Sequence, residues 1–501
     1  MKNKPNIVFI LTDDQGAWAL GTAGNKEIKT PHIDSLAKNG VRLKNFFCAS
    51  PVCSPARATL LTGRIPSQHG VHDWLAAGDT TAKYEPARNG ALIEYLQGQP
   101  GYTDYLTEAG YTCMISGKWH LGDTHHPQKS FTCWDVHAKG GSSYYGAPMI
   151  SNGVLYEEPG YVTDIITDNA LTQLNAFIKK AAKNGSSNGN RQNDTVNAAI
   201  NDTPFYLSVH YTAPHSPWTR ENHPAETYDY YYNNCPFKSV PDNLSPPEWV
   251  EHLNIPVTSP EMRREFLSGY YAAVTEMDKG VGRILDWLEQ NKLREDTLVV
   301  FTSDNGMNMG HHGIYGKGNA TYPLNMYEES VKVPFIASLP GVIPQGRVRA
   351  ELLSQYDFMP TLLEFALGNE GNNRRSSVLL PGTSFVALLK GGELKQKKDV
   401  FVCDEYGPVR MIRTEKWKYV YRCNHGHDEL YDLKNDPDEK TNNAGSSNFQ
   451  KTQTELRERL IQWFNRYTDK NNDGFKLPVT GLGQIGLCGE YPDEKIFKSF
   501  E

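Results

Sequence analysis

The sequence predicts an α/β fold, in which helices cover a mostly parallel central sheet. Short apolar runs, as expected of strands buried on both faces, alternate with longer segments whose apolar residues recur at helical spacing. Several of the short runs lead directly into polar residues, and ligands in parallel sheets bind beyond the carboxyl ends of the strands. The sequence therefore predicts a layered domain with a polar site along one edge of its sheet.

The order of these segments supports this fold. The expected strands are 6–11, 111–115, 205–209, 298–302 and 333–338. The expected helices are 31–40, 102–110, 164–182, 262–291 and 358–367. The clearest helix is 262–291, where Leu267, Tyr270 and Val274 begin a three-to-four spacing that marks an amphipathic face.

Residues 368–377 predict a linker, and the pattern of apolar residues changes after them. Beyond it, the short segments 400–403, 409–413 and 417–422 suit a small antiparallel sheet, with 456–467 as a covering helix. We expect two units: residues 1–380, which carry the chemistry, and a C-terminal subdomain of residues 381–501.

Composition excludes several classes of protein. The 501 residues are 39% hydrophobic and 22% charged, which argues against a disordered chain. A net charge of −7 gives no support for nucleic-acid binding, and no apolar stretch is long enough to span a membrane. The run Ile7 to Leu11 is too short for a signal peptide, so the location is cytoplasmic, or periplasmic or secreted if a leader was removed. The eight cysteines lack metal-ligand spacing.

Oxygen ligands follow two of the predicted strands. Asp13 and Asp14 come directly after the first strand, and Asp304 and Asn305 come after 298–302. Two carboxylate-bearing strand ends in one sheet predict a cation site, because unpaired buried carboxylates are costly. Hard oxygen ligands suit Ca²⁺, with Mg²⁺ as the alternative.

Cys53 is a candidate nucleophile. It precedes a short helical run that Gly63 ends, and Arg57 follows one turn later. A helix N-terminus and a nearby cation both favour the thiolate. On position alone, a buried structural thiol is the more common role of cysteine.

A group of cationic side chains follows other strand ends. It comprises Lys118, His120 and His215, together with Lys317. Singly, each is more often a core histidine or a solvated lysine, but together they predict an anion site.

Cys53-Ser54-Pro55-Ala56-Arg57, followed by Leu61-Thr62-Gly63-Arg64, resembles the signature of the type I sulfatases. Gly117 to Gly122, Ala213 to His215 and His312 to Gly318 match further signatures of that family. Ala56 departs from the pattern, which usually has serine there. The resemblance runs from Pro5 to about Leu367 and recurs weakly in Glu429 to Leu433.

This resemblance implies an alkaline phosphatase-like α/β/α sandwich and an enzyme that hydrolyses sulfate esters. It implies that a formylglycine-generating enzyme oxidises Cys53, and that the formylglycine hydrate attacks sulfur to give a covalent sulfo-enzyme intermediate. The implied Ca²⁺ ligands are Asp13, Asp14, Asp304, Asn305 and the modified Cys53. Among the implied catalytic residues, Arg57 favours the ionised hydrate, and Lys118, Lys317 and His215 offset the charge of the sulfate. His215, with Lys317 as a second candidate, protonates the departing alcohol. His120 takes a proton as sulfate is expelled.

The expected substrate is a sulfated small molecule or oligosaccharide, and by analogy with family members that have such a C-terminal subdomain we favour a sulfated sugar. Loop residues beside the motifs are predicted to line the pocket: His72, Trp74, Trp218, Arg220 and His311. For the two tryptophans, packing under the loop is about as plausible as stacking on a sugar. The alternatives are a phosphonate monoester or phosphodiester hydrolase of the same superfamily, and a non-catalytic binder of sulfated glycans if Cys53 is unmodified.

Overall fold

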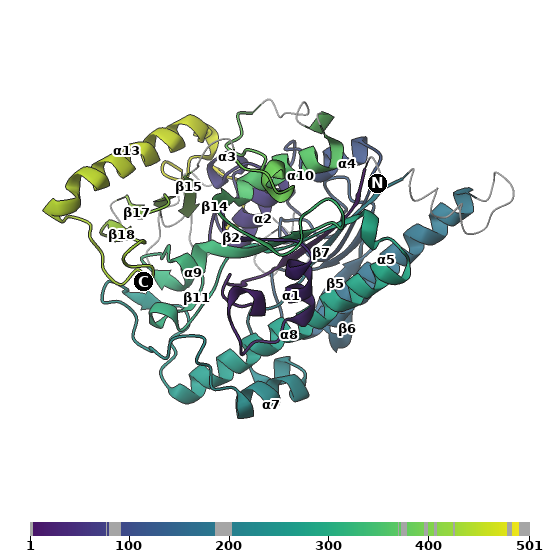
Figure 1. Cartoon of the computed structure of the whole chain (residues 1–501), viewed down its shortest axis with the longest axis horizontal. Coiled ribbons are helices and arrows are strands. Elements are labelled where there is room, and N and C mark those ends of the chain that lie inside the picture. The colour runs from purple at the N-terminus through teal and green to yellow at the C-terminus, as the bar shows by residue number, and fades with distance from the viewer. Residues whose placement is uncertain are drawn as a thin grey trace.

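The computed structural model describes residues 4–76, 78–79, 92–185, 203–368, 370–371, 378–394, 399–404, 408–423, 426–477 and 483–489. A ten-stranded sheet forms its centre (Figure 1). In spatial order the strands are β14 (Arg347–Ser354), β2 (Val41–Phe47), β13 (Lys332–Ser338), β9 (Thr297–Ser303), β1 (Asn6–Thr12), β7 (Phe205–His210), β3 (Thr112–Lys118), β4 (Cys133–His137), β5 (Tyr145–Ser151) and β6 (Val154–Tyr161).

The middle of this sheet is parallel. Strands β9, β1, β7, β3 and β4 all run in one direction, so their carboxyl ends lie at the same edge. Antiparallel strands join on either side: β13 pairs with β9 and β2, and β5 pairs with β4 and β6. The mostly parallel sheet is confirmed. The strand expected at 333–338 forms, and it runs antiparallel to both of its neighbours.

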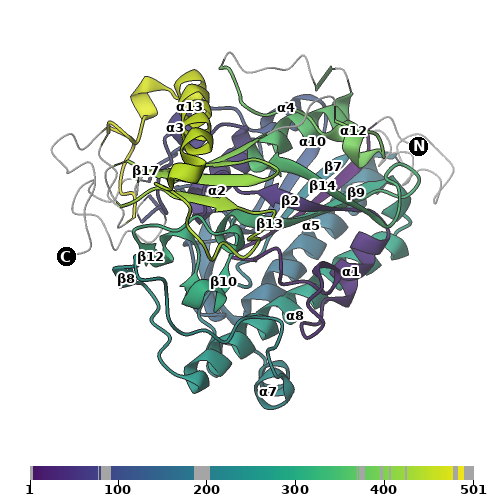
Figure 2. The same cartoon turned by 60° about the vertical axis from the view of Figure 1, so that its left-hand side comes forward.

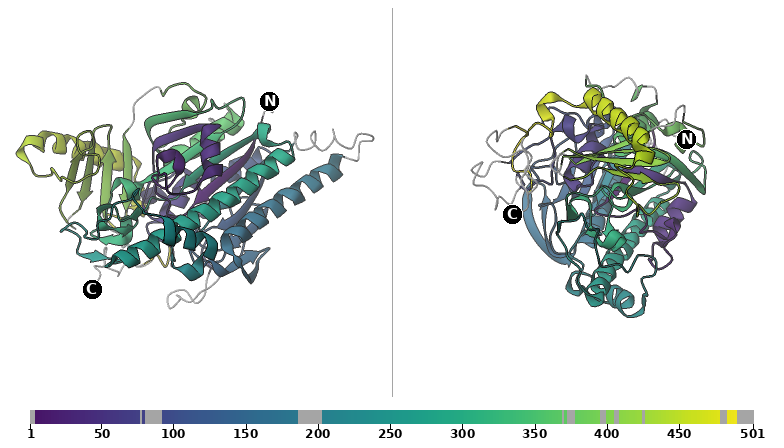
Figure 3. Two further views of the ribbon diagram at one scale, coloured as in Figure 1. Left: turned by 60° about the horizontal axis from the view of Figure 1, so that its bottom comes forward. Right: turned by 90° about the vertical axis from the view of Figure 1, so that its left-hand side faces the viewer.

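Two layers of helices cover the sheet, as predicted. Along β1, Ile7, Phe9 and Leu11 contribute to the core on one face, and Val8 and Ile10 contribute to the core on the other. The first face is covered by α2 (Cys53–Thr62), α4 (Tyr102–Glu108) and α10 (Phe358–Leu367). The second is covered by α1 (Pro31–Lys38), α5 (Val162–Gly185) and α8 (Pro260–Gln290), of which α5 and α8 lie side by side in Figures 1 and 3.

The C-terminal subdomain is an antiparallel sheet with one long helix, as the sequence predicts (Figure 2). Its strands are β15 (Val400–Asp404), β16 (Val409–Arg413), β17 (Trp417–Arg422) and β18 (Glu429–Asp432), and the helix is α13 (Gln450–Tyr467). The domain boundary at residue 380 stays a prediction. Most of the predicted linker, residues 372–377, lies outside the described residues.

Shorter elements complete the described chain: α3 (Pro66–His69), α7 (Ala225–Asn234), α9 (Glu328–Val331) and α12 (Val386–Leu389), with β8 (His252–Leu253), β10 (Asn308–Met309), β11 (Tyr315–Gly316) and β12 (Thr321–Tyr322). Among the described helices, none is both long and apolar enough to cross a bilayer. No disulfide bond joins any of the eight cysteines, all of which lie in the described part of the chain.

A segment near the C-terminus returns to a loop near the N-terminus. Gln484 N–H donates to the Trp74 carbonyl at 2.7 Å, and Ala76 N–H donates to the Gln484 carbonyl at 3.0 Å. The Gln484 side chain accepts from His72 N–H at 2.8 Å and donates to the Gly70 carbonyl at 3.0 Å. One glutamine therefore fixes the loop 70–76 through both its backbone and its side chain.

We predict that Gln484→Ala loosens this loop. The substitution leaves the His72 N–H and the Gly70 carbonyl without their partner, which costs about 1–3 kcal/mol against local opening. Amide hydrogen exchange at residues 72–76 should accelerate. The matched control is Gln290→Ala, an exposed glutamine at the end of α8. Equal exchange in the two variants would show that Gln484 does not hold the loop.

Candidate active site

Polar residues gather at the carboxyl edge of four neighbouring parallel strands. Asp13 and Asp14 follow β1, and Asp304 follows β9, whose Ser303 pairs with Thr12. Lys118 is the last residue of β3, and His215 follows β7. Because the strand order is β9-β1-β7-β3, these side chains converge although they are far apart in the sequence.

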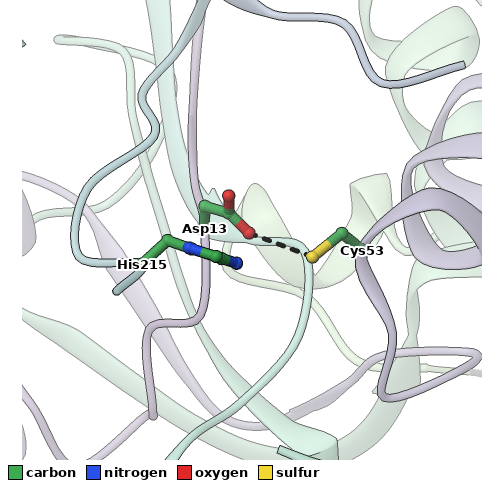
Figure 4. Close-up of side chains that lie close together, drawn as sticks. All are labelled: Asp13, Cys53 and His215. Carbon is green, nitrogen blue, oxygen red and sulfur yellow. Dashed lines mark hydrogen bonds between the residues drawn. The ribbon is translucent and has the colours of Figure 1, made fainter. Parts of the chain in front are cut away.

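Cys53 faces this edge from the first turn of α2. It is the first residue of the helix, which ends at Gly63 with a left-handed φ of 67°. Its thiol donates to Asp13 Oδ1 at 3.2 Å, and Lys317 Nζ donates to its Sγ at 2.7 Å. Figure 4 shows Asp13 with Cys53 and His215 close by.

The expectation that position and Arg57 favour the thiolate is wrong. Burial raises the pKa of the Cys53 thiol, and the negative charge of Asp13 raises it further, against the opposing effect of Lys118 and Lys317. Arg57 is directed elsewhere: Nε donates to Asp304 Oδ2 at 2.9 Å and Nη1 to the Lys118 carbonyl at 3.0 Å. Burial and Asp13 therefore disfavour the thiolate, which is the nucleophilic form of cysteine.

Three buried carboxylates form the centre of the site. One oxygen each of Asp13, Asp14 and Asp304 lies within 4.8 Å of the others. Lys118 Nζ lies 2.5 Å from Asp13 Oδ2, and Lys317 Nζ lies 2.6 Å from Asp14 Oδ1.

The pKa values of these carboxyls respond to burial and charge in opposite ways. Burial alone raises the pKa of Asp13, but Lys118, His215 and Arg57, with Lys317, hold it well below its ordinary value. Burial and the charge of Asp13 raise the pKa of Asp304 to about 7. The side chains present therefore leave the cluster short of positive charge.

The residues fit a hard divalent cation. Asn305 Nδ2 donates to Asp14 Oδ1 at 2.8 Å, while its Oδ1 is buried and finds no hydrogen-bond partner among the described residues. An unpartnered amide oxygen beside three carboxylates is an oxygen-rich ligand set of the kind that Ca²⁺ and Mg²⁺ prefer.

Buried residues that the sequence analysis missed fix the carboxylate backbones. Gln355 Nε2 donates to the Asp304 carbonyl at 2.6 Å, and its Oε1 accepts from Ala49 N–H at 3.1 Å. The Tyr270 hydroxyl donates to the Asp14 carbonyl at 3.0 Å. No motif identifies these two residues, since each acts through a backbone group distant in the sequence.

The two histidines present different ring nitrogens. His215 Nδ1 donates to the Ser216 carbonyl at 2.8 Å, and Nε2 lies 3.6 Å from Asp14 Oδ2. His120, at a left-handed φ of 55°, donates from Nε2 to the Leu75 carbonyl at 3.2 Å. Its Nδ1 is buried without a partner in the described chain. Because a carbonyl only accepts, these contacts fix the tautomer of each neutral ring.

A cavity of about 690 Å³ opens beside this cluster. Cys53, His120, His215 and Lys317 line it, whereas Lys118 and Arg57 are buried and absent from its lining. The remaining lining residues are Trp74, Leu75, Ala76, Gly78, Asp79, Lys139, Gly140, Gly141, Ser142, Ser216, Pro217 and Asn319.

Of the five residues predicted to line the pocket, Trp74 does. His72 and Trp218 lie inside the protein instead. His72 Nε2 donates to the Asn472 carbonyl at 2.8 Å, and Trp218 Nε1 donates to the Pro214 carbonyl at 2.8 Å. Of the two roles considered for the tryptophans, Trp218 therefore has the structural one, packing under its loop.

Arg220 and His311 also lie away from this lining. Arg220 is exposed and makes a two-pronged pair with Asp229, with both distances 2.7 Å. The His311 ring packs 5.0 Å from Trp18. Conversely, Asp79, Lys139, Ser142 and Asn319 line the cavity and were not predicted, because they lie on loops without a motif.

Comparison with known proteins agrees with this geometry. The family model described as Sulfatase matches residues 5–368, and the model described as N-sulphoglucosamine sulphohydrolase, C-terminal, matches residues 310–466. An ulvan-active sulfatase of Formosa agariphila is 28% identical over 91% of this chain and 80% of its own. An N-acetylglucosamine-6-O-sulfatase of Bacteroides thetaiotaomicron is 26% identical over 94% of this chain and 88% of its own.

A solved structure shares the fold. It is that of a protein in complex with its substrate D-glucosamine-2-N,6-O-disulfate, and it superposes with a TM-score of 0.75. Sequence identity is 24%, with 94% of this chain and 99% of the other covered. The fold class and the family resemblance are thus confirmed, and the chain belongs to the sulfatase family, the hydrolases of sulfuric esters.

Proposed function

We propose that this sulfatase removes sulfate from a sulfated carbohydrate, with formylglycine at position 53. The observation that carries the proposal is the meeting of Cys53, Asp13 and Lys317 beside one cavity. Two of the relatives above are named for carbohydrate substrates. Trp74 adds an aromatic side chain in the cavity lining, which suits the face of a sugar ring.

Oxidation of Cys53 to formylglycine would supply the nucleophile that the thiol does not provide. A protonated thiol in this setting is a weak nucleophile, and formylglycine supplies, as its hydrate, an oxygen nucleophile with a second hydroxyl. Lys317 Nζ already lies 2.7 Å from Sγ, so it is placed to donate to an oxygen at that position. The covalent sulfo-enzyme route and the maturation enzyme belong to this proposal.

The cation site belongs to it as well. Asp13, Asp14, Asp304 and Asn305 would hold one Ca²⁺, with Mg²⁺ as the alternative, and the ion would supply positive charge against sulfate. Ca²⁺ is favoured because it accepts many oxygen ligands in a flexible arrangement.

The side chains in and around the cavity have separate roles in binding charge and transferring protons. Lys317, paired with Asp14, contributes positive charge beside Cys53. In its imidazolium form, His215 keeps the Nδ1–H bond to the Ser216 carbonyl and can deliver the proton on Nε2 to the departing alcohol. His120 can accept a proton at Nδ1, and burial with the charges of Lys118 and Arg57 lowers its pKa well below the usual value, which keeps the ring neutral. Arg57 orients Asp304, and Lys118 orients Asp13.

The decisive test compares ester classes on protein co-expressed with a formylglycine-generating enzyme. We expect release of sulfate from 4-nitrophenyl sulfate and from at least one sulfated monosaccharide. We expect far slower hydrolysis of a phosphate diester and a phosphonate monoester. Cys53→Ala should remove the activity while leaving the fold intact by circular dichroism. A preference for the phosphorus esters would establish the first alternative, and glycan binding without turnover would establish the second.

Removal of the cation should destabilise the protein. Without it, three buried carboxylates repel one another, so chelation by EDTA should lower the melting temperature and added Ca²⁺ should restore it. Asp14→Asn should weaken this response to Ca²⁺. The control is Asp229→Asn, which changes an exposed carboxylate paired with Arg220 and should respond like the unchanged protein. A melting temperature insensitive to EDTA and Ca²⁺ would contradict the site.

A further inference from the structure

The carboxyl group of Asp79 has no role in the chemistry described above. Asp79 lines the same cavity as Cys53 and His120. Its Oδ1 atom is buried and has no hydrogen-bond partner in the part of the chain that the structure describes. A buried polar atom without a partner costs roughly 1–3 kcal/mol. The cost is offset if a ligand in the cavity donates to it.

The backbone on the N-terminal side of Asp79 is held in place. Gly78 has a left-handed φ of 88°, and a Cβ there would lie only 2.9 Å from the Cβ of Ile93, so glycine is required. Two residues earlier, Ala76 is bonded to Gln484, as described above. Asp79 therefore follows a glycine whose place is constrained, which favours a binding role for its side chain.

The positively charged groups near Asp79 do not offset the effect of its burial. Burial has the largest effect and raises the pKa of the Asp79 carboxyl well above its ordinary value; Asp123 acts in the same direction, and Lys118 and Lys139 oppose it. Lys118 is already paired with Asp13 at 2.5 Å. A hydroxyl or amino donor from a ligand would therefore supply the partner that the buried Oδ1 atom lacks.

We propose that Asp79 determines substrate specificity by accepting a hydrogen bond from a hydroxyl or amino group of the sugar that carries the sulfate. This inference rests on the proposed function. A sugar ring offers such donors beside its sulfate, whereas a simple aryl sulfate offers none. Asp79 would thus discriminate between substrates without acting on the sulfur.

The test compares substrates in Asp79 variants. The probes are glucose and glucosamine monosulfates and, as the donor-free reference, 4-nitrophenyl sulfate. Asp79→Ala should lower kcat/KM for the best sugar substrate roughly 10- to 100-fold, because it leaves the sugar donor without its acceptor. It should leave kcat/KM for 4-nitrophenyl sulfate nearly unchanged. Asp229→Asn, outside the cavity lining, should change neither.

Asp79→Asn separates the two kinds of donor. It keeps an acceptor oxygen but cannot take the negative charge that an ammonium group would stabilise, so it should retain most activity on a sugar that presents a hydroxyl and lose it on one that presents an ammonium group. If Asp79→Ala lowers both substrate types equally, or neither, the inference is overturned while the proposed function stands. If the unchanged enzyme hydrolyses the aryl sulfate but no sulfated sugar, the carbohydrate proposal fails, and this inference fails with it.

Discussion

The repulsion among three buried carboxylates is the constraint on which the site depends. Asp13, Asp14 and Asp304 would not be stable together without nearby positive charge. Two buried cations supply part of that charge, since Arg57 pairs with Asp304 and Lys118 pairs with Asp13. The remaining charge would come from the cation proposed above, so the same requirement that stabilises the folded protein would also place positive charge beside the cavity.

The central strands explain why this arrangement was predictable. Parallel neighbours end together, so polar residues that follow β1, β9, β7 and β3 must meet, whatever their separation in the sequence. The apolar runs and the residues after them carried that information. Strand direction was less predictable, because the nearly uniform burial of β13 does not distinguish a parallel strand from the antiparallel one that forms.

Loop side chains and proton affinities could not be predicted in this way. Trp74 and Trp218 both follow motif residues, yet only non-local contacts decide that Trp74 lines the cavity and Trp218 packs inside. Gln484 fixes the loop 70–76 from the other end of the chain. The protonated state of Cys53 depends on its burial and on Asp13, which position in a helix does not reveal.

Because burial and Asp13 disfavour the thiolate, the chemical state of Cys53 is the central question. The most direct measurement is the mass of the Cys53 peptide from active protein, taken alongside its specific activity. We expect the CH₂–SH group to be replaced by CHO, with activity proportional to the modified fraction. Full sulfatase activity in protein whose Cys53 thiol is intact would contradict the proposed role of formylglycine.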